Sequence, residues 1–335
     1  MSNKCKALLF CLTLLCGILY SCEDGTEELI DPIIVAEGGR FLQGYPVKFS
    51  AEIPSTAKIS NVSLYWDFGD GFSDNGIEVE HTYSDTGDYV VSLSVEGKTS
   101  SKTTTREIYV KPSLELLASV TINVDEPSGL TLGLGGTSLW TVSDRTGDIY
   151  QIDFEGTVMK TLNINGGDLE GISFDKRDST FWICKESINS IAHIDSTGNT
   201  LLEKEIPRVS EGSGLEGISI DTDQDLIYAI KEKNNSALIQ FNDSLESLNF
   251  QRLGFAPDLS GASYSKALQG LWVLSHEASS VFLLDTSGML LESYGIVMNQ
   301  PEGIVFDDEF DLFYIVDDAT EKLNTYGFWS QTPSF

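Results

Sequence analysis

Cysteine is scarce in this 335-residue chain: of its five cysteines, only Cys184 lies beyond residue 22. Cys184 belongs to the apolar string 181–184, a context that predicts a buried small hydrophobic residue and not a nucleophile. After the N-terminal processing argued below, no pair of cysteines is left for an intramolecular disulfide. The fold must therefore be stabilised by its hydrophobic core, which the 41% hydrophobic and 10% aromatic residues can provide.

Basic residues are also few. The 21 lysines and arginines stand against 51 aspartates and glutamates, which gives a formal net charge of −30. Such a charge repels nucleic acid and anionic lipid, so we exclude both as partners. It favours the binding of cations instead.

Long apolar runs are missing from the sequence except at the N-terminus, where residues 7–20 follow Lys4 and Lys6. These fourteen residues are too few to span the hydrocarbon core of a bilayer. A short apolar stretch behind basic residues is typical of a signal peptide.

The residues around Cys22 predict where that peptide is cleaved. The string Leu-Tyr-Ser-Cys at 19–22 resembles a bacterial lipobox, although Tyr20 is larger than is usual at its position. We therefore predict a lipoprotein signal peptide over residues 1–21, lipidation of Cys22 as the membrane anchor, and an acidic tether over residues 22–31. An ordinary secretory signal is the alternative. The acidic run behind Cys22 resembles surface-export signals of some gram-negative lipoproteins, which implies an outer-membrane lipoprotein of the cell envelope, exposed at the surface.

Residues 32–112 show the pattern of an antiparallel β-sandwich. Clusters of Pro, Gly and Asn or Asp separate short strand-like segments at 47–51, 62–66, 89–95 and 105–110. The string Trp-Asp-Phe-Gly-Asp-Gly at 66–71, followed by His-Thr-Tyr at 81–83, resembles the PKD domain, an Ig-like sandwich. We expect Asp67 and Asp70 to cap backbone groups of a turn, and His81 to belong to the fold. The resemblance implies a spacer or adhesion module.

Residues 113–328 contain a repeat. Five related strings are marked by a glycine, and these glycines are separated by 42, 46, 44 and 42 residues: Gly129, Gly171, Gly217, Gly261 and Gly303. Each is followed by a short apolar strand, a turn, a second strand and a third strand. A fourth strand completes the first four units, and four antiparallel strands at this period are typical of β-propeller blades. The predicted fold class is therefore all-β: an Ig-like sandwich, then a five-bladed β-propeller, then a C-terminal tail over residues 329–335.

The fifth unit is short by one strand, because the chain ends soon after its third. Residues 116–124 stand just before the first repeat glycine, where each other unit has its fourth strand. We predict that this segment supplies the missing outer strand of the last blade, which closes the ring and leaves no unpaired edge between the first and last blades.

The repeated Glu-Gly-Ile and Ser-Gly-Leu strings, the blade period and the order of the terminal strands resemble the SdiA-regulated (YjiK-like) propellers over residues 114–328. The resemblance implies a five-bladed propeller distantly related to NHL repeats, with a bound calcium in at least one member. It implies no established activity.

Two sets of residues are expected to surround one mouth of the central channel. The first strand of a blade begins, and the second strand ends, at the same end of an antiparallel sheet. The residues just before the repeat glycines are Ser128, Glu170, Glu216, Ser260 and Glu302. At the ends of the second strands, fifteen or sixteen residues after each glycine, come the second-strand acids Asp144, Glu186, Glu232, Glu277 and Asp318.

Of these residues, we predict that Glu170, Glu216 and Glu302 are the metal ligands. Carboxylates that converge in a narrow channel cannot all stay ionised, so they must gain protons or bind a cation. Oxygen ligands without clustered histidine or cysteine point to Ca²⁺ as the cofactor. For the second-strand acids a structural role stays open, in which each accepts backbone hydrogen bonds at its own blade turn.

Two functions remain open at this stage. The favoured one is a non-enzymatic binding or scaffold module at the envelope, with calcium at the channel mouth and a carbohydrate or an envelope protein as its partner. The alternative is a calcium-dependent hydrolase of a small anionic or sugar-derived substrate, for which His276, beside Glu277, is the only candidate base. The sequence shows no Ser-His-Asp arrangement, phosphate loop or dinucleotide fingerprint.

Overall fold

The computed structural model describes residues 6–7, 20–21, 31–37, 40–53, 62–97, 100–207 and 214–329. It divides the chain into two compact units, Met1–Val110 and Lys111–Phe335. The predicted lipidation site, Cys22, lies outside the described residues; ahead of it, β1 (Lys6–Ala7) pairs with β2 (Tyr20–Ser21). In the described part of the chain, no helix has the length and apolar character that crossing a membrane requires.

The first unit contains the predicted sandwich of two antiparallel sheets. One sheet has the order β3 (Ile33–Ala36), β4 (Pro46–Glu52), β7 (Glu78–Thr82). The other has the order β6 (Ser73–Asn75), β5 (Ser63–Asp67), β8 (Gly87–Glu96), β9 (Ser101–Val110). Alternate residues of each strand point inward, so Phe49 from one sheet meets Trp66 and Leu93 from the other in a shared core.

The turn after β5 has the role that its composition predicted. The Oδ1 of Asp67 accepts a hydrogen bond from the backbone amide of Gly69 at 2.9 Å, and the Oδ1 of Asp70 accepts one from Phe72 at 3.1 Å. His81 Nε2 lies 2.6 Å from the Oδ2 of Asp70. These side chains stabilise the turn and the sandwich, as expected.

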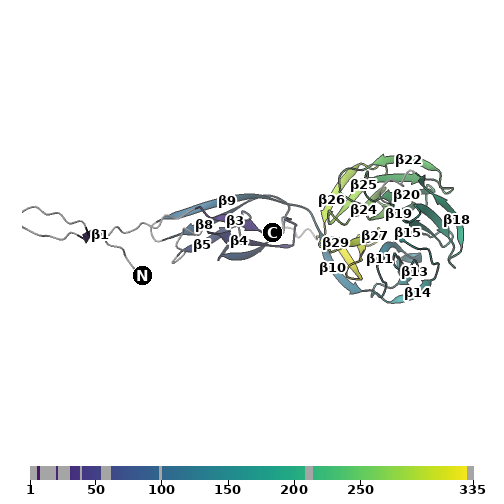
Figure 1. The fold of residues 1–335 in the computed structure, drawn as a ribbon, viewed down its shortest axis with the longest axis horizontal. Helices are drawn as coiled ribbons and strands as arrows, with labels where there is room; N and C mark the ends of the chain where they lie inside the picture. Colours follow the sequence, from purple (N-terminus) through teal and green to yellow (C-terminus); the bar gives the residue numbers. More distant parts are fainter. Residues whose placement is uncertain are drawn as a thin grey trace, which may run out of the picture. The chain divides into compact units, whose positions relative to one another are not determined.

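The second unit contains five four-stranded antiparallel sheets, which Figure 1 shows arranged around a common centre. Blade one consists of β11 (Pro127–Leu132), β12 (Leu139–Ser143), β13 (Ile149–Ile152) and β14 (Val158–Leu162), with the 3-10 helix η1 (Leu134–Gly136) after β11. Blade two consists of β15 (Leu169–Asp175), β16 (Thr180–Lys185), β17 (Ser190–Ile194) and β18 (Thr200–Glu205). Blade three consists of β19 (Leu215–Asp221), β20 (Leu226–Lys231), β21 (Ala237–Phe241) and β22 (Ser247–Arg252). Blade four consists of β23 (Gly261–Ser265), β24 (Gly270–Ser275), β25 (Ser280–Asp285) and β26 (Leu290–Gly295).

Blade five confirms the predicted closure of the ring. Its strands β27 (Pro301–Asp307), β28 (Leu312–Asp317) and β29 (Lys322–Phe328) are completed by β10 (Leu114–Thr121), from the opposite end of the unit. The pairing of β10 with β29 is antiparallel and runs from Leu114 opposite Phe328 to Thr121 opposite Lys322. The outer strand of the last blade is therefore supplied by the segment before the first.

Five hydrophobic cores lie between successive blades, so each blade is stabilised by its two neighbours. Cys184 is buried in one of them and behaves as the small hydrophobic residue that its context predicted. Nearer the axis, the repeat glycines let neighbouring first strands approach closely. A Cβ on Gly171 would lie 2.5 Å from the carbonyl oxygen of Glu216, and one on Gly303 would overlap that of Ser128. The recurring glycines are thus required by backbone contact between blades.

Candidate functional site

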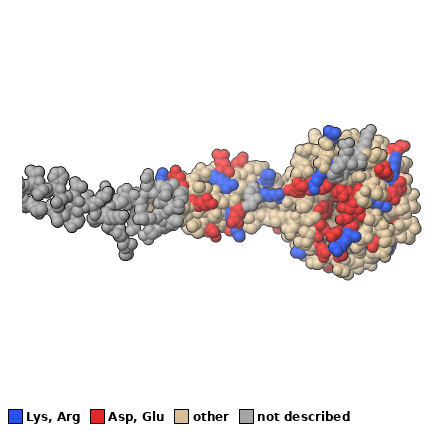
Figure 2. Space-filling view, viewed as in Figure 1, with Lys and Arg blue, Asp and Glu red and all other residues tan. Residues whose placement is uncertain are grey.

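Backbone hydrogen bonds bring the two predicted sets of residues to one end of the channel, which we call the acidic mouth. In four blades the amide of the second-strand acid donates to the carbonyl oxygen three residues before the repeat glycine. These bonds join Asp144 to Glu126 (3.1 Å), Glu186 to Asp168 (3.0 Å), Glu232 to Gly214 (3.3 Å) and Asp318 to Gln300 (3.0 Å). Figure 2 shows acidic side chains gathered toward the middle of the propeller face that it displays.

The residues before the repeat glycines are positioned by β-bulges. The register between first and second strands shifts around Ser128, Glu170, Glu216 and Glu302. A bulge adds an unpaired residue and redirects its side chain, which places these residues at the channel rather than in the ladder.

Blade four departs from this pattern. His276 stands fifteen residues after Gly261, as Glu186 does after Gly171, and its carbonyl oxygen accepts from Ser279 (2.9 Å) as that of Glu186 accepts from Asn189 (2.9 Å). Glu277 is displaced by one residue; its side chain is 50% exposed and lies 3.4 Å from the Nζ of Lys233. The predicted ring of five second-strand acids is therefore four acids and a histidine, with Glu277 outside it.

Three carboxylates cluster where blades one and two meet. The carboxylate oxygens of Asp144, Asp168 and Glu170 lie within 4.8 Å of one another. Burial raises the pKa of Glu170 to about 7; the neighbouring carboxylates add to that rise, and the hydroxyl of Ser128, which donates to Glu170, opposes it. Burial and the contact with Asp168 likewise raise the pKa of Asp144 to about 6. This cluster holds protons near neutral pH unless a cation replaces them.

A second cluster lies where blades two and three meet. The carboxylate oxygens of Glu186, Glu216 and Glu232 also lie within 4.8 Å of one another. Glu216 is only 7% exposed, and no hydrogen-bond donor among the described residues reaches its carboxylate. Burial, together with the carboxylates around it, raises the pKa of Glu216 well above its ordinary range. A buried carboxylate without a donor is costly, so this position calls for a proton or a cation.

Glu302 belongs to neither cluster, so the three glutamates predicted as one ligand set are distributed around the mouth. Its Oε1 lies 3.8 Å from the Nδ1 of His276, and burial raises the pKa of Glu302 to about 8. Next to it in the ring, Asp318 has a buried Oδ1 without a hydrogen-bond partner in the described part of the chain, and burial raises its pKa. Glu170 and Glu216 thus belong to different clusters, and their assignment with Glu302 as metal ligands stays a prediction.

Most basic residues beside the acids are directed elsewhere. Lys185 pairs with Glu203 on β18 at 3.0 Å, and Lys231 donates to backbone carbonyls of its own turn. One cation does reach the acidic mouth: Lys233 Nζ lies 2.6 Å from the Oε1 of Glu232. Lys233 was not among the predicted residues, because it lies in a turn whose direction the strand pattern does not predict.

Capping of the blade turns falls largely to other acids. Asp258 accepts hydrogen bonds from the backbone amide of Glu277, both at 3.1 Å, and Asp317 accepts them from Asn299 (3.1 Å) and Thr320 (3.0 Å). Among the second-strand acids, Glu186 accepts one backbone hydrogen bond, from Gly214 at 3.0 Å. Gly214 precedes blade three, so this bond joins two blades and does not cap the turn of blade two in which Glu186 lies.

Two family models match the chain, and a search of solved structures finds distant likenesses. The SdiA-regulated family matches residues 113–320, and the PKD domain matches residues 33–110. The hydrazine synthase of Kuenenia stuttgartiensis is similar at 16% identity over 58% of this chain and 56% of that chain (TM-score 0.42). An auxiliary nutrient binding protein from Bacteroides ovatus is similar at 12% identity over 89% of this chain and 98% of that one (TM-score 0.45). A nidogen/laminin complex is similar at 12% identity over 80% of this chain and 94% of that one (TM-score 0.43). Because its family model covers more than half of the chain, the protein belongs to the SdiA-regulated family, with a PKD domain ahead of its propeller.

Proposed function

We propose that this protein is a lipid-anchored binding module of the bacterial cell envelope, and that the acidic mouth of its propeller holds calcium. The observation that carries the calcium assignment is Glu216, a buried carboxylate that no donor of the described residues reaches and that lies beside Glu186 and Glu232. A divalent cation would add positive charge beyond that of Lys233, which is already paired with Glu232.

The donor set favours calcium over transition metals. Both clusters offer carboxylate oxygens only, whereas zinc and copper sites in proteins are built largely from imidazole and thiolate. Calcium accepts six to eight oxygen ligands in flexible geometry, so water can complete a shell that three carboxylates begin. Glu186, Glu216 and Glu232 are the first candidates, and Asp144, Asp168 and Glu170 are the second.

The calcium proposal is tested by titration calorimetry on the chain from residue 23 onward after its metals are removed by a chelator. We expect calcium to bind with a dissociation constant of roughly 10⁻⁴–10⁻³ M, the range of extracellular calcium modules. Glu216→Gln removes the central charge and should weaken binding by about tenfold or more. Glu155→Gln, an exposed position on a turn of blade one, is the matched control and should bind like the unaltered protein. No binding heat, or equal affinities for the two variants, would rule the site out.

The membrane anchor makes a separate prediction. Cys22→Ala removes the sulfur that would carry the lipid, so we expect the variant to appear as a soluble protein or an unprocessed precursor. Cell fractionation and mass spectrometry of the N-terminus measure this directly. A variant that is processed and still membrane-bound would contradict the lipoprotein assignment.

A further inference from the structure

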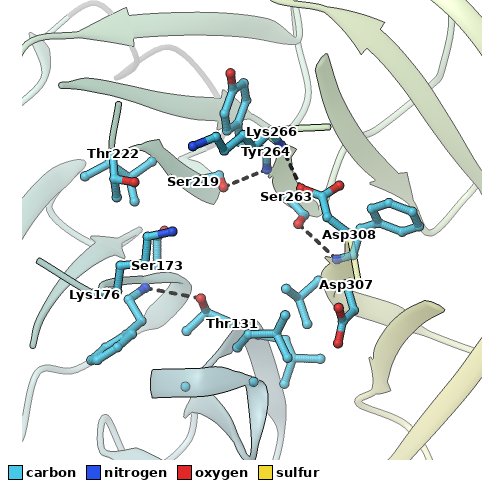
Figure 3. A pocket seen from close by; sticks show the side chains of 18 of the residues that line it. Thr131, Ser173, Lys176, Ser219, Thr222, Ser263, Tyr264, Lys266, Asp307 and Asp308 are labelled. Carbon is cyan, nitrogen blue, oxygen red and sulfur yellow. Dashed lines mark hydrogen bonds between the residues drawn. The ribbon is translucent and has the colours of Figure 1, made fainter. Parts of the chain in front are cut away.

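The end of the channel opposite the acidic mouth opens into a cavity of about 390 Å³, which we call the far cavity (Figure 3). It lies where the first strands of the blades end. Between the two mouths lies a space of only about 10 Å³, lined by aliphatic side chains one residue after the repeat glycines: Leu130, Ile172, Ile218, Ala262 and Ile304. A space of that size holds one water molecule at most, so the far cavity is separate from the acidic mouth.

Hydroxyl groups line the inner end of the far cavity. Thr131, Ser173, Ser219 and Ser263 each stand two residues after a repeat glycine, and each is at most 9% exposed. Three of their oxygens accept a hydrogen bond from a backbone amide of another blade: Thr131 from Phe174 (3.2 Å), Ser219 from Tyr264 (2.8 Å) and Ser263 from Phe306 (3.0 Å). These bonds fix the oxygen atoms and leave the hydroxyl protons for donation. The hydroxyl of Ser173 has no hydrogen bond among the described residues.

The same wall also offers acceptors. Asp221 is 2% exposed, and its Oδ1 accepts hydrogen bonds from the backbone amides of Asp223 (2.9 Å) and Gln224 (3.3 Å). Its Oδ2 lies near the hydroxyl of Tyr264, and burial together with this carboxylate raises the pKa of Tyr264. The wall thus combines hydroxyl donors with carboxylate acceptors, and a ligand that both accepts and donates hydrogen bonds suits it.

The charge of the lining argues against an anion. Lys266 is already paired with Asp223 at 2.5 Å, and Lys176, the other lysine of the lining, forms no ion pair with a described residue. The lining also contains four carboxylates, those of Asp221, Asp307, Asp308 and Glu309, which would repel an anion. Aromatic side chains, including the 63% exposed Phe310, form part of the rim.

From these contacts we propose that the far cavity binds a neutral polyhydroxylated ligand, the size of a mono- or disaccharide. Each sugar hydroxyl can accept from the serine and threonine hydroxyls and donate to the carboxylates of the lining, and sugar rings pack on aromatic faces. The volume falls within the roughly 300–1,000 Å³ of small-molecule sites. The proposal names a ligand class for the binding role proposed above, and it does not depend on calcium.

The experiment is saturation-transfer NMR and calorimetry on the chain from residue 23 onward. The neutral probes are glucose, galactose, mannose, N-acetylglucosamine, maltose and cellobiose, with citrate and spermidine as anionic and cationic probes. We expect at least one neutral sugar to bind, and Ser173→Ala to weaken it roughly three- to tenfold at an unchanged melting temperature. Phe310→Ala, at an exposed position that folding tolerates, should weaken it as well. Glu155→Gln, on an exposed turn of blade one outside the cavity lining, should leave the affinity unchanged.

Several outcomes would overturn the proposal. These are the binding of none of the six sugars, the binding of citrate or spermidine alone, and an unaltered sugar affinity in both Ser173→Ala and Phe310→Ala. Repeating the titration in chelator separates this site from the calcium site. Sugar binding that persists supports the far cavity, whereas binding that is lost would place the sugar at the acidic mouth and refute the assignment.

Discussion

A shortened chain that begins at Glu126, and so lacks β10, is expected to lose the cooperative unfolding of the propeller. The deleted segment contributes Leu114 to the core between blades four and five, and Ile122 and Val124 to the core between blades five and one. All three are at most 1% exposed. Truncation of one such side chain costs about 2–5 kcal/mol, so their joint loss approaches the roughly 5–15 kcal/mol that stabilises a typical domain. The unpaired edge of β29 would in addition favour aggregation.

The matched control begins at Lys111, the first residue of the second compact unit, and keeps β10. Calorimetry of the two shortened chains separates the closure strand from the loss of the first unit. We expect the control to melt in one sharp transition and the chain from Glu126 to melt broadly or precipitate. If both melt alike, the strand adds little and closure does not stabilise the ring.

The fold could be predicted from the sequence because its signals are local and repeated. The glycine spacing indicates the blade period, and the missing strand of the last unit predicts the closure that β10 makes. One further signal was present and overlooked. An aromatic residue stands eleven positions after every repeat glycine and is buried between blades: Trp140, Trp182, Tyr228, Trp272 and Tyr314.

The grouping of the acids could not be predicted, because it depends on single-residue changes of register. A bulge at Glu170 or Glu216 shifts the side chain by one position, and blade four pairs without one. Glu277 stands sixteen residues after Gly261, whereas the other four acids stand fifteen after their glycines; the fifteenth position in blade four is His276. The clusters also join acids of neighbouring blades, such as Glu186 and Glu216, whose proximity requires the ring to be closed.

The metal-free protein is expected to become less stable as the pH rises from about 5 to about 8.5. Burial raises the pKa of Glu170 to about 7 and that of Glu302 to about 8, above the ordinary value of 4.5 for both. Between the ordinary and the raised pKa, the folded state binds more protons than the unfolded state, so unfolding becomes easier with increasing pH. One pKa unit corresponds to about 1.4 kcal/mol, so shifts of this size lower the melting temperature by several degrees.

Calcium should restore the stability that the metal-free protein loses as the pH rises, because it binds the same carboxylates once they are deprotonated. Calcium at a concentration of about one hundred times its dissociation constant adds about 2.7 kcal/mol to the free energy of unfolding. For a propeller of this size that is a rise in melting temperature of roughly 5–10 °C at pH 8.5, and a smaller rise at pH 5.5, where protons compete.

The double variant Glu170→Gln, Glu216→Gln distinguishes a cation site from a structural role, because the two accounts predict opposite effects on the stability of the metal-free protein. It removes two charges that the fold has to accommodate, so the metal-free variant should be at least as stable as the unaltered protein at pH 8.5, with a flatter dependence on pH. It should also lose most of its response to calcium, whereas Glu155→Gln should keep both properties. If the two glutamates instead cap backbone groups, the double variant will lose the same stability in chelator as in calcium. The measurement is thermal melting of the unaltered protein, the double variant and Glu155→Gln at pH 5.5 and pH 8.5, each in chelator and in excess calcium. These melts separate a cation site from a structural role, because only a cation site makes the melting temperature depend on both calcium and pH.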